Sequence, residues 1–120
     1  MSKETTFGEL LREARKRGGK TLGDVADFLG FKVSYISDIE HGRRPPWPAA
    51  KVIAVAGFLG FDEMALLRAA AEARGAVELD ARNASKAKLQ LGAALARSWS
   101  GLSDEQAARI AHVLDPKHEE

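Results

Sequence analysis

The stretch TLGDVADFLGFKVSYISDIEHGRRPP, residues 21–46, decides the fold because it holds two short helical patterns joined by one tight turn. Thr21 and Asp24 have the spacing of a capping box, so the first pattern begins at a defined residue. Gly30 follows the last apolar position and is suited to a left-handed helix end. We therefore expect a helix of eight or nine residues that ends at Gly30.

The second pattern starts after only two further residues and runs from about Val33 to position 41. Ile36 and Ile39 share one face of it, and Gly42 supplies its stop signal. Two helices joined this tightly cross steeply only where a small side chain makes the contact, and Ala26 lies where that crossing is expected.

Helical periodicity extends to both sides of this pair. Capping signals, glycine stops and proline breaks place the helices of the first part of the chain at about 6–17, 21–29, 33–41, 48–59 and 62–74. No alternating strand pattern accompanies them. The prediction is an all-α, five-helix domain over residues 1–75.

Residues 76–120 form a second region, in which Ser85 and Ser103 can cap two further helices with apolar faces. A two-helix region buries little by itself, so we expect these faces to form a dimer interface. An intrachain core is the alternative for Trp99 and Ile110. The expected interface residues are Val77, Leu79, Leu89, Leu95, Trp99, Ile110 and Leu114.

Composition excludes several classes of protein. The chain has 120 residues and no cysteine, so disulfide scaffolds, thiolate nucleophiles and Cys-ligated metal sites are ruled out. The three histidines are scattered, and no phosphate-binding loop or nucleophile elbow occurs, so we expect no metal, no cofactor and no enzymatic activity. We also expect a cytoplasmic location, because no apolar stretch is long enough for a membrane span and the first residues lack the apolar core of a signal peptide.

The charges balance overall, at 18 basic against 17 acidic residues, but they are unevenly placed. A first basic cluster, within residues 12–20, has only one acidic residue among it, Glu13, and a second basic cluster follows Gly42. Two basic clusters on a weakly charged body indicate an anionic polymer as partner, and solvated faces are the alternative. The clusters consist of Arg12, Arg15, Lys16, Arg17 and Lys20, and of Arg43 and Arg44.

Residues 21–46 closely resemble the helix-turn-helix of the Cro and lambda-repressor-like (XRE) family. The resemblance rests on a small residue four positions before the turn glycine, on an Ile-Ser-x-Ile-Glu segment, and on Gly-Arg-Arg followed by proline. It covers about residues 5–74 and departs from the family at Leu22, where glutamine is often found. The residues that carry it are Ala26, Gly30, Ile36, Ser37, Ile39, Glu40, Gly42, Arg43, Arg44 and Pro46.

This resemblance implies that residues 33–41 form a recognition helix in the major groove of DNA. It assigns the base-reading side to Lys32, Val33, Ser34, Ser37 and Asp38. Phosphate contacts are expected from Arg15, Lys16, Arg17, Lys20, Thr21, Tyr35, Arg43 and Arg44. Tyr35 is equally suited to covering the core. We expect Glu40 to be structural, bonded to a backbone group or to an arginine of the first helix, and Trp47 to anchor its proline-rich loop by packing.

The implied function is a transcriptional regulator, most simply a repressor that binds a palindromic operator as a homodimer and associates with the nucleoid when bound. Two helices from two copies would multiply the specificity of one short recognition helix. The alternative is an antitoxin whose C-terminal region binds a toxin while the DNA-binding domain regulates its own operon. A C-terminal region that senses a small ligand is a third possibility.

Overall fold

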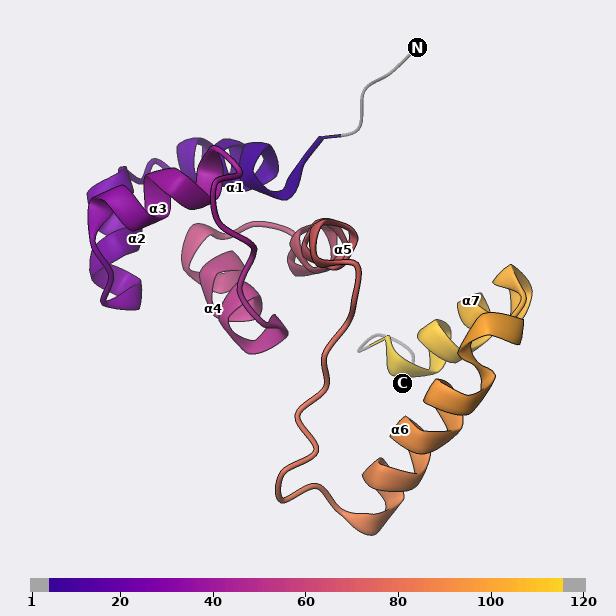
Figure 1. The fold of residues 1–120 in the computed structure, drawn as a ribbon. Coiled ribbons are helices and arrows are strands. Elements are labelled where there is room, and N and C mark those ends of the chain that lie inside the picture. Colours follow the sequence, from indigo (N-terminus) through magenta and orange to yellow (C-terminus); the bar gives the residue numbers. More distant parts are fainter. Residues whose placement is uncertain (1–4, 116–120) are drawn as a thin grey trace. The chain divides into compact units, whose positions relative to one another are not determined.

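The computed structural model describes residues 5–115, which form seven α-helices and one 3₁₀ turn with no strand among them (Figure 1). The chain divides into two units, an N-terminal unit that ends at Glu78 and a C-terminal unit that begins at Leu79. The all-helical class predicted from the periodicity is confirmed. The elements are α1 (Phe7–Arg17), α2 (Leu22–Leu29), α3 (Val33–Glu40), α4 (Ala49–Leu59), α5 (Glu63–Arg74), α6 (Lys86–Ser98), η1 (Trp99–Gly101) and α7 (Asp104–Leu114).

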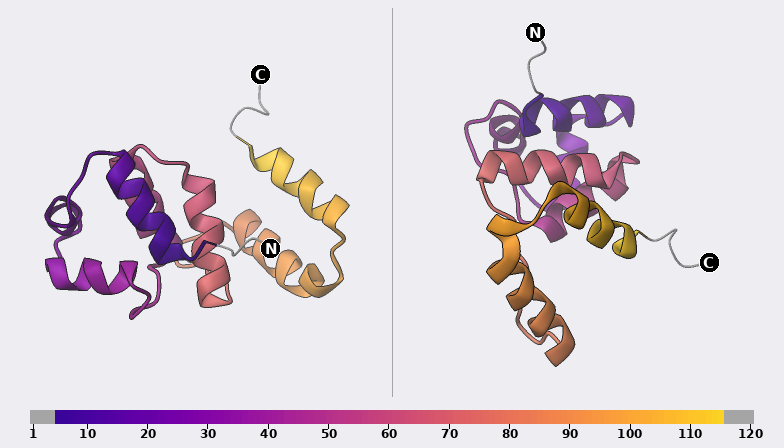
Figure 2. Two further views of the ribbon diagram at one scale, coloured as in Figure 1. Left: turned by 90° about the horizontal axis from the view of Figure 1, so that it is seen from above. Right: turned by 90° about the vertical axis from the view of Figure 1, so that its right-hand side faces the viewer.

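The N-terminal unit encloses one hydrophobic core. Helix α1 packs against α3, α4 and α5, while α2 packs on α3 and α4 packs on α5. Both views in Figure 2 show α1 running beside α5. The largest fully buried side chains come from all five helices: Leu11, Val25, Ile36, Ile39, Val52, Val55 and Leu66.

The α2–α3 corner has the geometry that its sequence predicts. Gly30 takes a left-handed backbone conformation, with φ of 76°. The N–H groups of Gly30 and Phe31 both donate to the carbonyl of Ala26, at 2.8 and 2.9 Å. Ala26 itself is buried, so its methyl group lets α3 approach closely.

A second close approach joins the start of α1 to the end of α3. A Cβ atom added at Gly8 would lie 2.6 Å from the carbonyl oxygen of Ile39, and still closer to that of Glu40. These are backbone atoms, which cannot rotate away. Glycine at position 8 therefore allows the two helices to touch.

Five expected helix boundaries lie one residue outside the observed helices, three of them only because the expected range included the N-cap residue, at Thr6, Thr21 and Asp62. Helix α3 ends at Glu40, one residue before the expected end, because His41 is the C-cap and its backbone, with φ of −91° and ψ of 3°, is no longer helical. Pro48 precedes α4 as its N-cap, since its ψ of 162° is extended rather than helical.

The C-terminal unit consists of α6, η1 and α7. Ser85 caps α6, and Ser103 with Gln106 forms the predicted capping box of α7. Neither helix contains a buried residue. Across the described part of the chain, no helix is both long and apolar enough to cross a membrane.

Candidate nucleic-acid interface

Helix α3 separates a buried face from an exposed one. Ile36 and Ile39 are sealed in the core, whereas Val33 and Ser34 are exposed on the opposite side. The expected base-reading residues all lie on this outer side: Lys32, Val33 and Ser34 are exposed, and Ser37 and Asp38 are half-buried. The structure thus brings these five residues onto one surface.

Asp38 is held by the two arginines that follow α3. Its carboxylate lies 3.2 Å from Nη1 of Arg43 and 3.9 Å from Nε of Arg44. Both arginine side chains are more than half exposed, so each pair is worth about 1 kcal/mol or less. Either arginine can therefore exchange Asp38 for a phosphate at little cost.

Tyr35 lies beneath one of these arginines. The guanidinium of Arg44 is 5.0 Å from the centre of the Tyr35 ring, which is itself in edge contact with Phe31. Tyr35 also packs on the core. Its ring therefore both covers the core and supports Arg44.

Lys51, in the first turn of α4, adds a cation that sequence reasoning missed. Its ammonium lies 4.7 Å from the centre of the Phe31 ring, next to the turn that precedes α3. No local spacing links residues 31 and 51, so only the packing of α4 reveals their contact.

Arg15 is not placed for the phosphate contact that was expected of it. It is 8% exposed, its Nε and Nη2 donate to the Glu40 carboxylate at 2.6 and 3.1 Å, and its Nη1 donates to the carbonyl of Lys20 at 3.1 Å. The hydrogen bonds to Glu40 raise the pKa of Arg15. Arg15 fastens α1 to α3, and Glu40 has the structural role predicted for it.

The other cations near the end of α1 remain apart from α3. Arg17 pairs with Glu13 at 2.8 Å on the surface of α1, and Lys16 is exposed. Lys20 lies over the ring of Phe58, which stacks on Phe28. Within residues 5–115, no hydrogen bond or ion pair joins Lys16, Arg17 or Lys20 side chains to α3.

Thr21 is the N-cap of α2, and its hydroxyl and amide are both hydrogen-bonded within the capping box. Its hydroxyl accepts from the amide of Asp24 at 3.0 Å, and the Asp24 carboxylate accepts from the amide of Thr21 at 2.8 Å. The hydrogen bond from the Thr21 amide to the carboxylate, together with the nearby Thr21 side chain, lowers the pKa of Asp24. The helix start expected to attract a phosphate therefore already carries a carboxylate.

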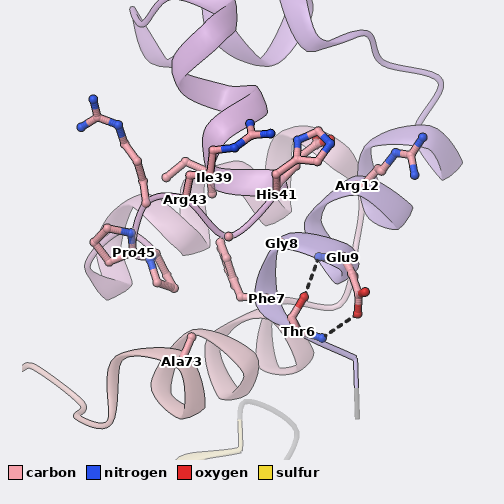
Figure 3. Close-up of a pocket in the computed structure, with 14 residues that line it drawn as sticks. Thr6, Phe7, Gly8, Glu9, Arg12, Ile39, His41, Arg43, Pro45 and Ala73 are labelled. Atoms are coloured by element: carbon pink, nitrogen blue, oxygen red, sulfur yellow. Dashed lines mark hydrogen bonds between the residues drawn. The ribbon is translucent and has the colours of Figure 1, made fainter. Parts of the chain in front are cut away.

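A depression of about 680 Å³ lies beside the end of α3 and the start of α1 (Figure 3). Arg12, His41 and Arg43 are among its lining side chains. His41 Nδ1 lies 2.8 Å from the carbonyl oxygen of Ser37. Arg12 and His41 thus join Arg43 at this edge of α3; Arg12 was expected only as a member of the first basic cluster, and His41 was not expected.

The loop after the arginines is anchored as its sequence predicts. Trp47 is buried and meets Phe7 edge to face, with ring centres 6.0 Å apart. Arg74 donates to the carbonyl of Pro46 at 2.7 Å. The loop that carries Arg43 is therefore tied to α1 and α5.

The expected dimer residues are accessible. Four of them lie on α6 and α7, Trp99 begins η1, and Val77 and Leu79 precede α6; among residues 5–115 none of the seven is buried. Trp99 and Leu114 are 66% and 69% exposed.

No group of histidines and acids in the described part of the chain could hold a metal ion.

The profile of a family described as "Helix-turn-helix domain" matches residues 6–70, which includes every element of this interface. The chain also resembles two curated proteins, each named "Transcriptional regulator ClgR", from two Mycobacterium tuberculosis strains, and is 44% identical to them over 39 residues. That match spans 32% of this chain and 35% of the relatives' length. Among solved structures, a SinR protein/SinI protein complex resembles it with a TM-score of 0.47 and 21% identity, over 96% of this chain and 100% of that one.

Proposed function

Since the chain belongs to the XRE-like helix-turn-helix family of DNA-binding proteins, whose profile matches over half of its length, we propose that it is a transcriptional regulator. It binds double-stranded DNA with the exposed face of α3 in the major groove. The observation that carries the proposal is the pairing of a core-facing Ile36 and Ile39 with an outward-facing Val33 and Ser34 on one short helix.

The side chains of that face divide by chemistry. Val33 can touch a thymine methyl group, and the hydroxyls of Ser34 and Ser37 can donate or accept at base edges. Asp38 accepts from a cytosine amine once it is released by its arginines, and Lys32 reaches guanine or phosphate. The readout is sparse, so DNA shape contributes to the specificity.

The phosphate contacts come from basic side chains around α3. Arg43 and Arg44 are exposed at its end, and Lys51 lies next to its start. Arg12 and His41 line the depression beside the end of α3. Lys16, Arg17 and Lys20 contribute only if the duplex also reaches α1, and Arg15 is occupied by Glu40.

One recognition helix reads too few base pairs for useful specificity, so the protein acts as a homodimer on a palindromic operator. Two copies place their α3 helices about 34 Å apart on one side of the duplex. Bound over a promoter in the cytoplasm, such a dimer blocks access of the transcription machinery. We therefore infer a repressor without enzymatic activity.

Selection of bound sites from random duplex DNA tests this function. The expected result is an enriched site with two inverted half-sites one helical turn apart. Recovery of unrelated sequences after repeated rounds, or of a single half-site, would contradict sequence-specific binding or the dimer respectively.

Three variants separate base reading from phosphate binding. Ser34→Ala and Ser37→Ala should lower the preference for the selected site over random DNA. Arg43→Ala should weaken binding to every duplex and reduce the salt slope by about one. A change in sequence preference alone for Arg43→Ala would mean that it reads a base.

An antitoxin is the second candidate, because the exposed apolar residues of α6 and α7 also fit a protein partner. A small toxin-like reading frame next to the gene would favour it. Prophage genes or a divergent promoter there would favour the plain regulator.

A further inference from the structure

The C-terminal unit is helical but has no core of its own. Helices α6 and α7 have 13 and 11 residues, and neither contains a buried side chain. Isolated helices of this length are marginal in water, and most helical stability in proteins comes from packing an apolar face. The faces of α6 and α7 therefore need a cover.

Helix α6 places a lysine within its apolar stripe. Lys88 and Leu95 lie seven residues apart and hence on one side of the helix, and Trp99 follows Leu95 four residues later, at the start of the η1 turn that continues α6. Lys86 lies two residues from Lys88, and hence about 200° away around the helix. The apolar stripe thus begins with one positive charge at its N-terminal end.

Helix α7 has the opposite sign at the corresponding place. Asp104 precedes Ala107, Ala111 and Leu114 at spacings of three, four and three residues, so it shares their side of the helix. Within residues 5–115, neither Lys88 nor Asp104 has an ion pair. Each stripe therefore starts with one unpaired charge, and the two charges are complementary.

The two helix starts also differ in how they suit the helix dipole. The first turn of α6 contains two lysines and no acid, although the positive end of the dipole favours acids. The first turn of α7 contains Asp104 and Glu105. An acidic helix start placed beside α6 would therefore supply the negative charge that α6 lacks.

The chain cannot provide this neighbour from its own α7. Lys88 lies near the start of α6, and Asp104 follows the far end of the same helix, about 15 Å of helix away. Figure 2 shows α7 turning back only after η1, so its start lies at the end of α6 that is remote from Lys88. A second copy supplies an acidic start with no such constraint.

We propose that two copies of the chain associate through the C-terminal unit, with α6 of each lying parallel to α7 of the other and Lys88 meeting Asp104 of the partner. A two-fold axis perpendicular to the helices makes this contact twice. The apolar stripes then cover each other in a four-helix arrangement. This inference deepens the homodimer of the proposed function and states which helices meet.

Charge reversal tests the pairing by sedimentation velocity without DNA. The wild-type chain should be dimeric at micromolar concentration. Lys88→Glu and Asp104→Lys should each raise the dimer dissociation constant about tenfold or more, because like charges then meet twice. An equimolar mixture of the two variants should recover dimers, since both contacts between unlike chains join opposite charges.

Lys86→Glu is the matched control, because it makes the same change in the same turn on the opposite face. It should leave the dimer unchanged. Lys88→Glu also suits the dipole of α6 better than lysine does, so a loss of dimer cannot be ascribed to a weakened helix.

Several outcomes would overturn the proposal. A monomeric wild-type chain at 100 times that concentration would mean that a different protein covers these faces. Equal disruption by Lys86→Glu, or no recovery on mixing, would place the contact elsewhere. Because no DNA is present, a failure here is distinct from a failure of DNA binding, which site selection measures separately.

Discussion

Removal of Arg15 should destabilise the N-terminal unit rather than weaken its binding to DNA. Arg15→Met keeps an unbranched side chain of similar reach but leaves the Glu40 carboxylate, 3% exposed, without its counter-charge. The sequence had placed Arg15 among the phosphate contacts, and the two roles predict opposite results. The experiment therefore decides whether the burial seen in the structure governs this residue.

The expected magnitude follows from the contacts that are lost. Breaking a buried ion pair by removing one partner costs about 3–5 kcal/mol. The hydrogen bond from Arg15 to the carbonyl of Lys20 adds about 1 kcal/mol. Small domains are stable by about 5–15 kcal/mol, so the single variant loses a large part of the total. Arg15→Met with Glu40→Leu removes both charges and should cost less than Arg15→Met alone.

Urea unfolding measures this effect, with the fluorescence of the buried Trp47 as the signal from the same core. With a slope of about 1–2 kcal/mol per M, even the lower bound of about 3 kcal/mol for the ion pair alone lowers the midpoint by about 1.5–3 M. Salt-dependent DNA binding of the folded fraction is measured in parallel and should keep its slope. An unchanged midpoint together with a smaller salt slope would refute the structural role and restore Arg15 as a phosphate ligand.

The remaining predictions concern local packing, pH and the missed cation. Gly8→Ala should destabilise the N-terminal unit, because the added methyl group meets backbone oxygens of α3. Gly57→Ala has no atom within 4 Å of the added carbon and should stabilise α4 by about 1 kcal/mol. Equal shifts of the melting temperature in the two variants would contradict the close approach of α1 to α3. The pKa of Asp24 is lowered in the folded state, so the ionised carboxylate should stabilise the fold at pH values above its ordinary pKa, and this stability should be lost as the pH falls through the pKa of the folded state. Asp24→Asn should remove this part of the acid unfolding curve. An identical pH profile for the variant would argue against the capping interaction. Lys51→Ala should weaken binding to all duplexes and lower the salt slope by about one without changing the selected sequence, and a binding isotherm that is unchanged at every salt concentration would remove Lys51 from the interface.

The local elements were predictable because their signals lie within a few residues. The capping boxes at Thr6, Thr21 and Ser103 form as their spacing predicts. Gly30 and Gly60 take left-handed conformations at the ends of their helices. Such signals act over three or four residues of chain, so they are visible without knowledge of the fold.

The candidate interface was only partly predictable for the same reason. The outward positions of α3 follow from its 3.6-residue period, and all five expected base-reading residues lie on that side. Arg15 and Lys51 depend on partners 25 and 20 positions away, at Glu40 and Phe31, and no local pattern encodes those contacts.

By itself, the sequence determined the all-α class, the helix starts and stops, the α2–α3 corner and the surface on which bases would be read. Only the tertiary structure decided which cations remain free. Packing of α1 on α3 buried Arg15 against Glu40, and packing of α4 brought Lys51 beside the start of α3. The physical reason is that helix periodicity fixes which way a side chain points, whereas its charge is available to a ligand only if no distant element has already paired or buried it.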